Sequence, residues 1–139
     1  MNYFDYKDGH LKSEDIFITN ITKEVHTPFY CYSAKGLKTN FNILKDAFKD
    51  IDTKICYATK SNSNLSILKL LQEEGAGADV VSVGELKKSL IANIDPKNIV
   101  FSGVGKTKDE IEYAIVNRIF QINAESISEI KEIDRIAKL

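Results

Sequence analysis

A strand-like apolar run followed by a helical pattern recurs four times in the second part of the chain. Strands that alternate with helices at roughly 20–25 residues per unit form parallel sheets with right-handed crossovers, so the repeat predicts an α/β fold. An open doubly wound sheet and a (β/α)8 barrel share this pattern, and repeat counting does not separate them. The expected strands lie at 54–59, 78–82, 98–102 and 118–123, and the expected helices at 65–74, 85–92, 108–116 and 127–139.

Helix-start signals follow three of these strands. At each joint a hydroxyl residue precedes a glutamate by three positions, which is the spacing of a capping box. In that motif the hydroxyl accepts the third helical amide, and the glutamate accepts the amide of the cap residue. The pairs are Ser82 and Glu85, Thr107 and Glu110, and Ser126 and Glu129. Asn64 is expected to cap the first helix of the repeat, and Gly75 to follow its end.

The chain before the repeat is less regular. Residues 29–32 predict another strand, and Ser33 is expected to cap a helix whose apolar face contains Leu37, Phe41, Leu44 and Phe48. The first 25 or so residues show no clean period, so an irregular segment or an added edge strand is expected there. The expected organisation is an N-terminal segment, 1–27, followed by a barrel part, 28–139.

The number of units suggests a partial fold. A closed eight-stranded barrel needs about 250 residues, twice what four units supply. The last helical pattern reaches Leu139 without a cap signal. The sequence therefore predicts the first four βα units of a TIM-like barrel, with the chain stopping before closure. Such a half-barrel would leave sheet edges unpaired and apolar faces exposed.

Charge and hydropathy exclude several classes of partner. The 19 basic and 20 acidic residues give a net charge of -1, so neither nucleic acid nor an anionic membrane is an expected partner. No apolar run approaches the roughly 20 residues that span a bilayer. The first residues lack the basic and apolar regions of a signal peptide, and Cys31 and Cys56, inside apolar strand-like runs, are expected to be buried, reduced thiols. These features predict a cytoplasmic protein.

Lys60 is the first candidate for chemistry, because functional groups of parallel α/β folds gather at the carboxyl ends of strands. By the period of two, Lys60 shares a strand face with the small residues Cys56 and Ala58, which leaves room for a flat ligand. Tyr57 and Thr59 point to the opposite, bulky face. A lysine in such a place is most often simply exposed, and an amine that forms imines is the functional alternative.

Three other signals have ordinary explanations. Asp79, at the start of a buried strand, is first a cap or an ion-pair partner and second an active-site residue near Lys60. Residues 103–107 (Gly-Val-Gly-Lys-Thr) suggest a phosphate-binding loop, but Val100 occupies the place of its first glycine. Glu125 and Ser126 read as helix-start residues. The two histidines are too isolated to predict a metal site.

The string around Lys60 resembles the Tyr-Ala-Val-Lys-Ala-Asn signature of the fold-type III decarboxylases that depend on pyridoxal phosphate (PLP). Similar motifs follow in the family's order along nearly the whole chain, and the diaminopimelate branch is the most similar. They are residues 6–11, 27–33, 57–62, 75–86, 99–107 and 122–126. The chain departs from the family at His26, Thr59, Ser61 and Val83. The last of these replaces a glycine, so a left-handed backbone there would be strained.

The resemblance implies a PLP-binding barrel in which Lys60 carries the cofactor as a Schiff base and later acts as a base. It implies decarboxylation of meso-diaminopimelate to L-lysine by a homodimer of the complete protein. The other cofactor and acid groups of the family would come from later strands, a C-terminal β-domain and a second subunit, so the 139 residues alone are expected to be inactive. Two alternatives stay open: a non-catalytic remnant, and another fold-type III enzyme such as an ornithine or arginine decarboxylase or an amino-acid racemase.

Overall fold

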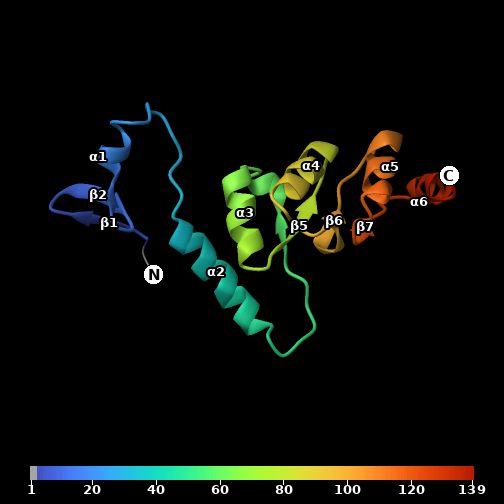
Figure 1. The fold of residues 1–139 in the computed structure, drawn as a ribbon, viewed down its shortest axis with the longest axis horizontal. Coiled ribbons are helices and arrows are strands. Elements are labelled where there is room, and N and C mark those ends of the chain that lie inside the picture. The colour runs from blue at the N-terminus through green and yellow to red at the C-terminus, as the bar shows by residue number, and fades with distance from the viewer. Residues whose placement is uncertain (1–2) are drawn as a thin grey trace. The chain divides into compact units, whose positions relative to one another are not determined.

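The computed structural model describes residues 3–139, which divide after Ala47 into two compact units. The boundary predicted between residues 27 and 28 stays a prediction about the complete barrel. Within the described residues, no helix is both long enough and apolar enough to cross a membrane. Each unit has its own sheet, and the labels follow Figure 1.

The first unit begins with a small antiparallel sheet where the sequence showed no period. Its strands are β1 (Phe4–Lys7), β2 (His10–Ser13) and β3 (Ile16–Phe17). Asp8 and Gly9 have φ of 52° and 77° and connect the paired residues Lys7 and His10. Two left-handed residues match the twist of a tight hairpin, so this Asp-Gly turn fixes the register.

Two helices complete the first unit, α1 (Ile18–Ile21) and α2 (Ala34–Ala47). Ser33 caps α2 as expected, because its Oγ accepts the Gly36 amide at 2.8 Å. Glu14 reinforces this cap from the hairpin, since its Oε1 accepts Ser33 Oγ at 2.7 Å and the Lys35 amide at 2.9 Å.

The strand predicted at 29–32 is wrong. These residues form neither a strand nor a helix, and no neighbouring strand among the described residues pairs with them. An aromatic, β-branched composition favours a strand only where a ladder partner exists. Without one, Tyr30 is 91% exposed, and its ring stacks on that of Tyr32.

The second unit contains the predicted repeat. The strands are shorter than expected, and the last helix ends at Ala137 rather than Leu139. The elements are β4 (Cys56–Ala58), η1 (Thr59–Ser61), α3 (Leu65–Glu73), β5 (Gly77–Val80), α4 (Val83–Ile91), η2 (Pro96–Asn98), β6 (Ile99–Phe101), α5 (Lys108–Val116), β7 (Gln121–Ile122) and α6 (Ile127–Ala137).

Strand order separates the two architectures that the repeat left open. The four strands are parallel and lie in sequential order, β4-β5-β6-β7. A doubly wound sheet reverses its order at a switch point and covers both faces with helices, whereas a barrel adds strands in one direction. Here α3, α4 and α5 pack on one face, around a core of Leu68, Leu86, Ala114 and the strand residues Val80 and Phe101. The order and the single helical layer are those of a partial barrel.

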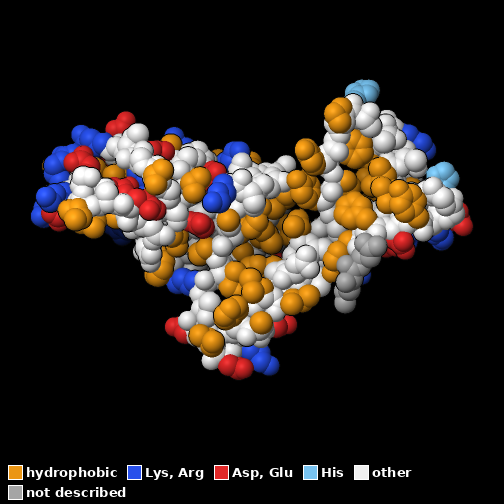
Figure 2. Space-filling model, turned by 180° about the vertical axis from the view of Figure 1, so that it is seen from behind, with side chains coloured by type: hydrophobic (Ala, Val, Ile, Leu, Met, Phe, Trp, Pro, Cys, Tyr) orange, Lys and Arg blue, Asp and Glu red, His pale blue; other side chains and the backbone are white. Residues whose placement is uncertain are grey.

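Among the described residues of the second unit, no helix forms a layer on the opposite face of this sheet. Cys56, Ala58, Asp79 and Val100 on this face are only half-buried. The second unit also exposes large apolar side chains, among them Ile127 at 74% and Phe120 at 52%. Figure 2 shows hydrophobic side chains gathered at the surface. This agrees with the exposure expected of four units out of eight.

Candidate active site at the carboxyl edge of the parallel sheet

The carboxyl ends of β4, β5, β6 and β7 meet along one edge, because the strands are parallel neighbours. The residues that follow them are Lys60 in η1, then Ser82, Ser102 and Asn123. Two of these touch directly, since Asn123 Nδ2 donates to Ser102 Oγ at 3.0 Å. Polar groups from successive units therefore converge at this edge, which is where parallel α/β folds hold their ligands.

Lys60 is exposed at the end of β4, and the residues around it are fixed. Thr59 is fully buried, and Ser61 Oγ lies 2.7 Å from Ala58 O and 2.8 Å from the Tyr57 hydroxyl. Among the described residues, no hydrogen-bond or ion-pair partner is found for the Lys60 amine. The predicted strand alternation ends at Ala58, so the η1 turn, not the pleat, directs Lys60.

Asp79 lies on the uncovered face of the sheet, paired in register with Ala58. Its neighbours Ala78 and Val80 point into the helical core and are fully buried. Asp79 Oδ1 is buried and has no hydrogen-bond partner among the described residues. A buried carboxylate oxygen without a donor is costly unless a ligand or another group supplies one. Among the described residues, Asp79 is therefore neither the helix cap nor the ion-pair partner that the sequence suggests first.

Cys56 shares the uncovered face with Asp79. Burial, followed by the negative charge of Asp79, raises the pKa of the Cys56 thiol above its ordinary value. The thiol is thus the protonated form at neutral pH, and Sγ lies 3.6 Å from Asn98 O. Both cysteines of the chain are free, as expected, but they are half-buried rather than buried.

The Gly103–Thr107 segment is a capped strand–helix turn and not a phosphate loop. The Lys106 amine, which would have to reach a phosphate, is buried against protein acceptors. Thr107 and Glu110 form a complete capping box at the start of α5.

The other two predicted capping boxes are only half present. Ser82 Oγ accepts the Glu85 amide and Ser126 Oγ accepts the Glu129 amide, as expected. Each glutamate, however, accepts the amide of the residue before the cap instead of the amide of the cap itself. Glu85 accepts from the Val81 amide and Glu129 from the Glu125 amide. Glu125 and Ser126 are helix-start residues, as expected.

The glycine that Val83 replaces is not needed for a left-handed backbone. Val83 begins α4, and it is not among the residues with positive φ. Its amide donates to Glu110 Oε1 at 3.0 Å, a bond that any residue except proline can make. The strain considered for this departure from the family is therefore absent.

Glu110 ties two helix starts together, and its charge should matter for stability. Hydrogen bonds from the Thr107 and Val83 amides lower the pKa of the Glu110 carboxyl below 4.5. A lowered folded-state pKa stabilises the fold above the unfolded value and loses that contribution as the pH falls through the folded value. We expect Glu110→Gln to cost about 1 kcal/mol at pH 6, typical of a helix cap, and less near pH 3. Urea unfolding at both pH values measures this, and an equal cost at both would contradict it.

A parallel sheet built in sequential order, with an unpaired lysine at the carboxyl end of its first strand, is typical of barrel enzymes that bind ligands at strand ends. Residues 35–139 match the family described as pyridoxal-dependent decarboxylase, pyridoxal binding domain. The chain belongs to this family.

Relatives and solved structures agree with this assignment. The diaminopimelate decarboxylase of Helicobacter pylori J99 is 52% identical over 112 residues, covering 81% of this chain and 28% of the relative. The crystal structure of diaminopimelate decarboxylase from M. jannaschii in complex with L-lysine has a TM-score of 0.93 at 38% identity, covering 99% of this chain and 33% of that one. The ornithine decarboxylase of Entamoeba histolytica has a TM-score of 0.75 at 25% identity, covering 86% and 38%. The chain spans about a third of the length of the curated relatives it matches.

Proposed function

We propose that this chain forms the first part of the PLP-binding barrel of a decarboxylase that converts meso-diaminopimelate to L-lysine. The observation that carries the proposal is Lys60, an exposed lysine without a partner among the described residues, at a strand's carboxyl end in a chain of this family. The names of the relatives support the substrate. The L-lysine bound to the M. jannaschii enzyme supports the product.

The residues present fit PLP. The Lys60 amine is accessible, and the neighbouring positions on the uncovered face, Ala58 and Gly77, are small. Asp79 Oδ1 offers a buried acceptor that lacks a donor. When bound, PLP supplies an electron sink for the charge left by loss of CO2.

Lys60 and Asp79 would have different roles in this part of the site. The Lys60 ε-amine would hold the cofactor and, when not bound to it, would accept or donate a proton at its Nζ. The Asp79 carboxylate accepts a hydrogen bond from a donor that arrives on the uncovered face, and so orients it. Both roles use only groups that the chain places at or beside the end of β4.

The diaminopimelate branch is better supported than the alternatives. Identity to the E. histolytica ornithine decarboxylase is 25%, against 37–52% for diaminopimelate decarboxylases. Lys60 is exposed and Asp79 Oδ1 has no partner among the described residues, which argues against a remnant that has lost its chemistry. The proposal includes a homodimeric, cytoplasmic complete protein that binds an amino-acid substrate, with neither nucleic acid nor membrane as a partner.

Covalent capture of PLP tests the cofactor site directly. The purified chain is mixed with equimolar PLP, its absorbance near the imine band is recorded, and the adduct is reduced with borohydride and mapped by mass spectrometry. We expect the label at Lys60 and loss of the band in Lys60→Met. Lys88→Met is the matched control, because Lys88 is also exposed and binds only Ser63 Oγ at 2.9 Å. A label spread over exposed lysines without enrichment at Lys60 would overturn cofactor binding by this chain.

A further inference from the structure

Two lysines lie at the carboxyl edge of the parallel sheet, and their surroundings are opposite. Lys60, after β4, is exposed. Lys106, in the turn after β6, has only 1% of its side chain exposed. An aldehyde cofactor that enters at this edge meets two amines, so the chain must direct it to one of them.

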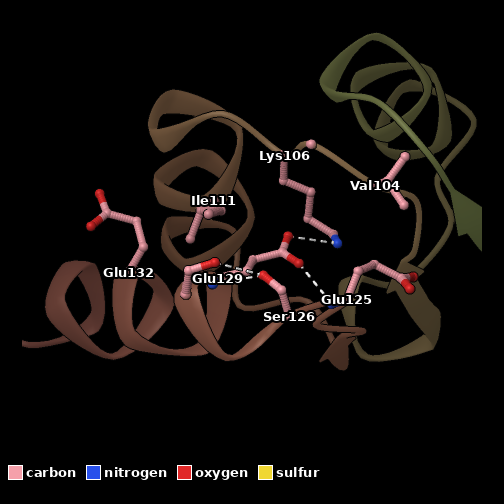
Figure 3. Close-up of a pocket in the computed structure, with 9 residues that line it drawn as sticks. Val104, Lys106, Ile111, Glu125, Ser126, Glu129 and Glu132 are labelled. Atoms are coloured by element: carbon pink, nitrogen blue, oxygen red, sulfur yellow. Dashed lines mark hydrogen bonds and ion pairs between the residues drawn. The ribbon is translucent and has the colours of Figure 1, made fainter.

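Every donor of the Lys106 ammonium is used. Its Nζ donates to Gly103 O at 2.7 Å and to Asn123 O at 2.7 Å. The third donor goes to Glu129 Oε1 at 2.9 Å (Figure 3). An ammonium has three N–H donors and no lone pair, so this set saturates it. The ring of Phe101, with its centroid 5.9 Å from Nζ, closes another side.

Glu129 is the charged member of this set, and its own position is fixed. Its second oxygen, Oε2, accepts the Glu125 amide at 2.7 Å, and its amide donates to Ser126 Oγ at 3.1 Å. The Glu125 hydrogen bond, opposed by burial and assisted by Lys106, lowers the pKa of the Glu129 carboxyl. The carboxylate is 10% exposed and is held against the amine from the first turn of α6.

We infer that Glu129 keeps the Lys106 amine unreactive toward carbonyl compounds and so leaves Lys60 as the reactive amine at this edge. The role of Lys60 as the cofactor lysine rests on the proposed function, whereas the low reactivity of Lys106 does not. For an amine to react with a carbonyl carbon, it must release a proton and offer its lone pair. Lys106 can do so only after its three hydrogen bonds open, and a buried amine that loses its carboxylate partner opens more readily.

Acetic anhydride tests this inference without PLP. The amine nitrogen forms an amide bond to one acyl carbon, acetate leaves with the electron pair, and the amine proton passes to solvent. Limited acetylation of the full 139-residue chain, followed by peptide mass spectrometry, gives a rate for each lysine. We expect Lys106 to react at least about tenfold more slowly than Lys60, and Glu129→Ala to raise the Lys106 rate about tenfold without changing the Lys60 or Lys88 rates.

Glu132→Ala is the matched control. Glu132 lies on the same helix and lines the same open hollow of about 450 Å³ beside the pair, but its carboxylate binds exposed Arg135. It should leave the Lys106 rate unchanged. A Lys106 rate equal to that of Lys60 in the unsubstituted chain, or an unchanged Lys106 rate in folded Glu129→Ala, would overturn the inference. If Glu129→Ala unfolds the chain, all lysine rates rise together, and the ratio of Lys106 to Lys60 in the unsubstituted chain decides. Slow Lys106 acetylation with no PLP at Lys60 would contradict only the proposed function.

Discussion

Replacing Lys60 by alanine is expected to lower the rate of CO2 release from meso-diaminopimelate at least about a thousandfold, because under the proposed function it removes the amine that bonds to the cofactor. The assay needs a protein of the relatives' length, since the chain spans about a third of them. A chimera supplies it: the aligned residues replace the corresponding segment of the H. pylori decarboxylase, to which they are 52% identical over 112 residues. The measurement is CO2 release at saturating substrate and PLP.

Two further variants make this result specific. Lys60→Arg keeps the charge but cannot form the covalent bond, so it should be as inactive as Lys60→Ala. Lys88→Ala removes an exposed lysine that binds only Ser63 and should stay within about twofold of the parent. Activity of a folded Lys60→Ala chimera within tenfold of the parent would refute the role of Lys60. Absence of CO2 release from the parent chimera would count against the proposed function.

The parts of the fold that were predictable depend on local signals. Hydrophobic period, cap residues and turn glycines lie within a few residues of each other, so the four strand–helix units and the cap residues Asn64, Ser82, Thr107 and Ser126 could be read from the sequence. The place of Lys60 at a strand end followed from the same signals. The order of the strands did not, because pairing between units is a long-range property.

The features that the sequence predicted wrongly or not at all also depend on long-range pairing or on signals too short to recognise. The segment 29–32 has strand composition but no partner strand, and composition alone does not reveal that. The hairpin at Asp8 and Gly9 carries a recognisable turn signal, but its strands are too short for a clear period. The bond between Lys106 and Glu129 joins residues 23 positions apart, and only the fold brings them together. The one local hint was a lysine between glycines and a helix cap.

Gly77 shows how tightly the sheet beside the site is packed, and replacing it should have the largest effect on stability. A Cβ at residue 77 would lie 2.2 Å from Asn98 O and 2.9 Å from Cys56 Sγ. The first contact is with backbone, so β5 or the η2–β6 segment must shift, because no side-chain rotation relieves it. We expect Gly77→Ala to lower the free energy of unfolding by about 3 kcal/mol, the upper part of the usual range for overpacking. Urea unfolding of the chain measures this loss.

Two comparisons identify the cause of that loss. Gly84→Ala also adds a methyl group, but inside α4 with its nearest neighbour, Ser82 Oγ, at 3.8 Å, and should be neutral or stabilise by up to about 1 kcal/mol. Cys56→Ala combined with Gly77→Ala removes the contact with sulfur but leaves the one with Asn98 O. If the backbone contact dominates, the double variant recovers little of the stability lost in Gly77→Ala. Recovery of most of it would show instead that the Cys56 side chain is what excludes a larger residue beside Asp79.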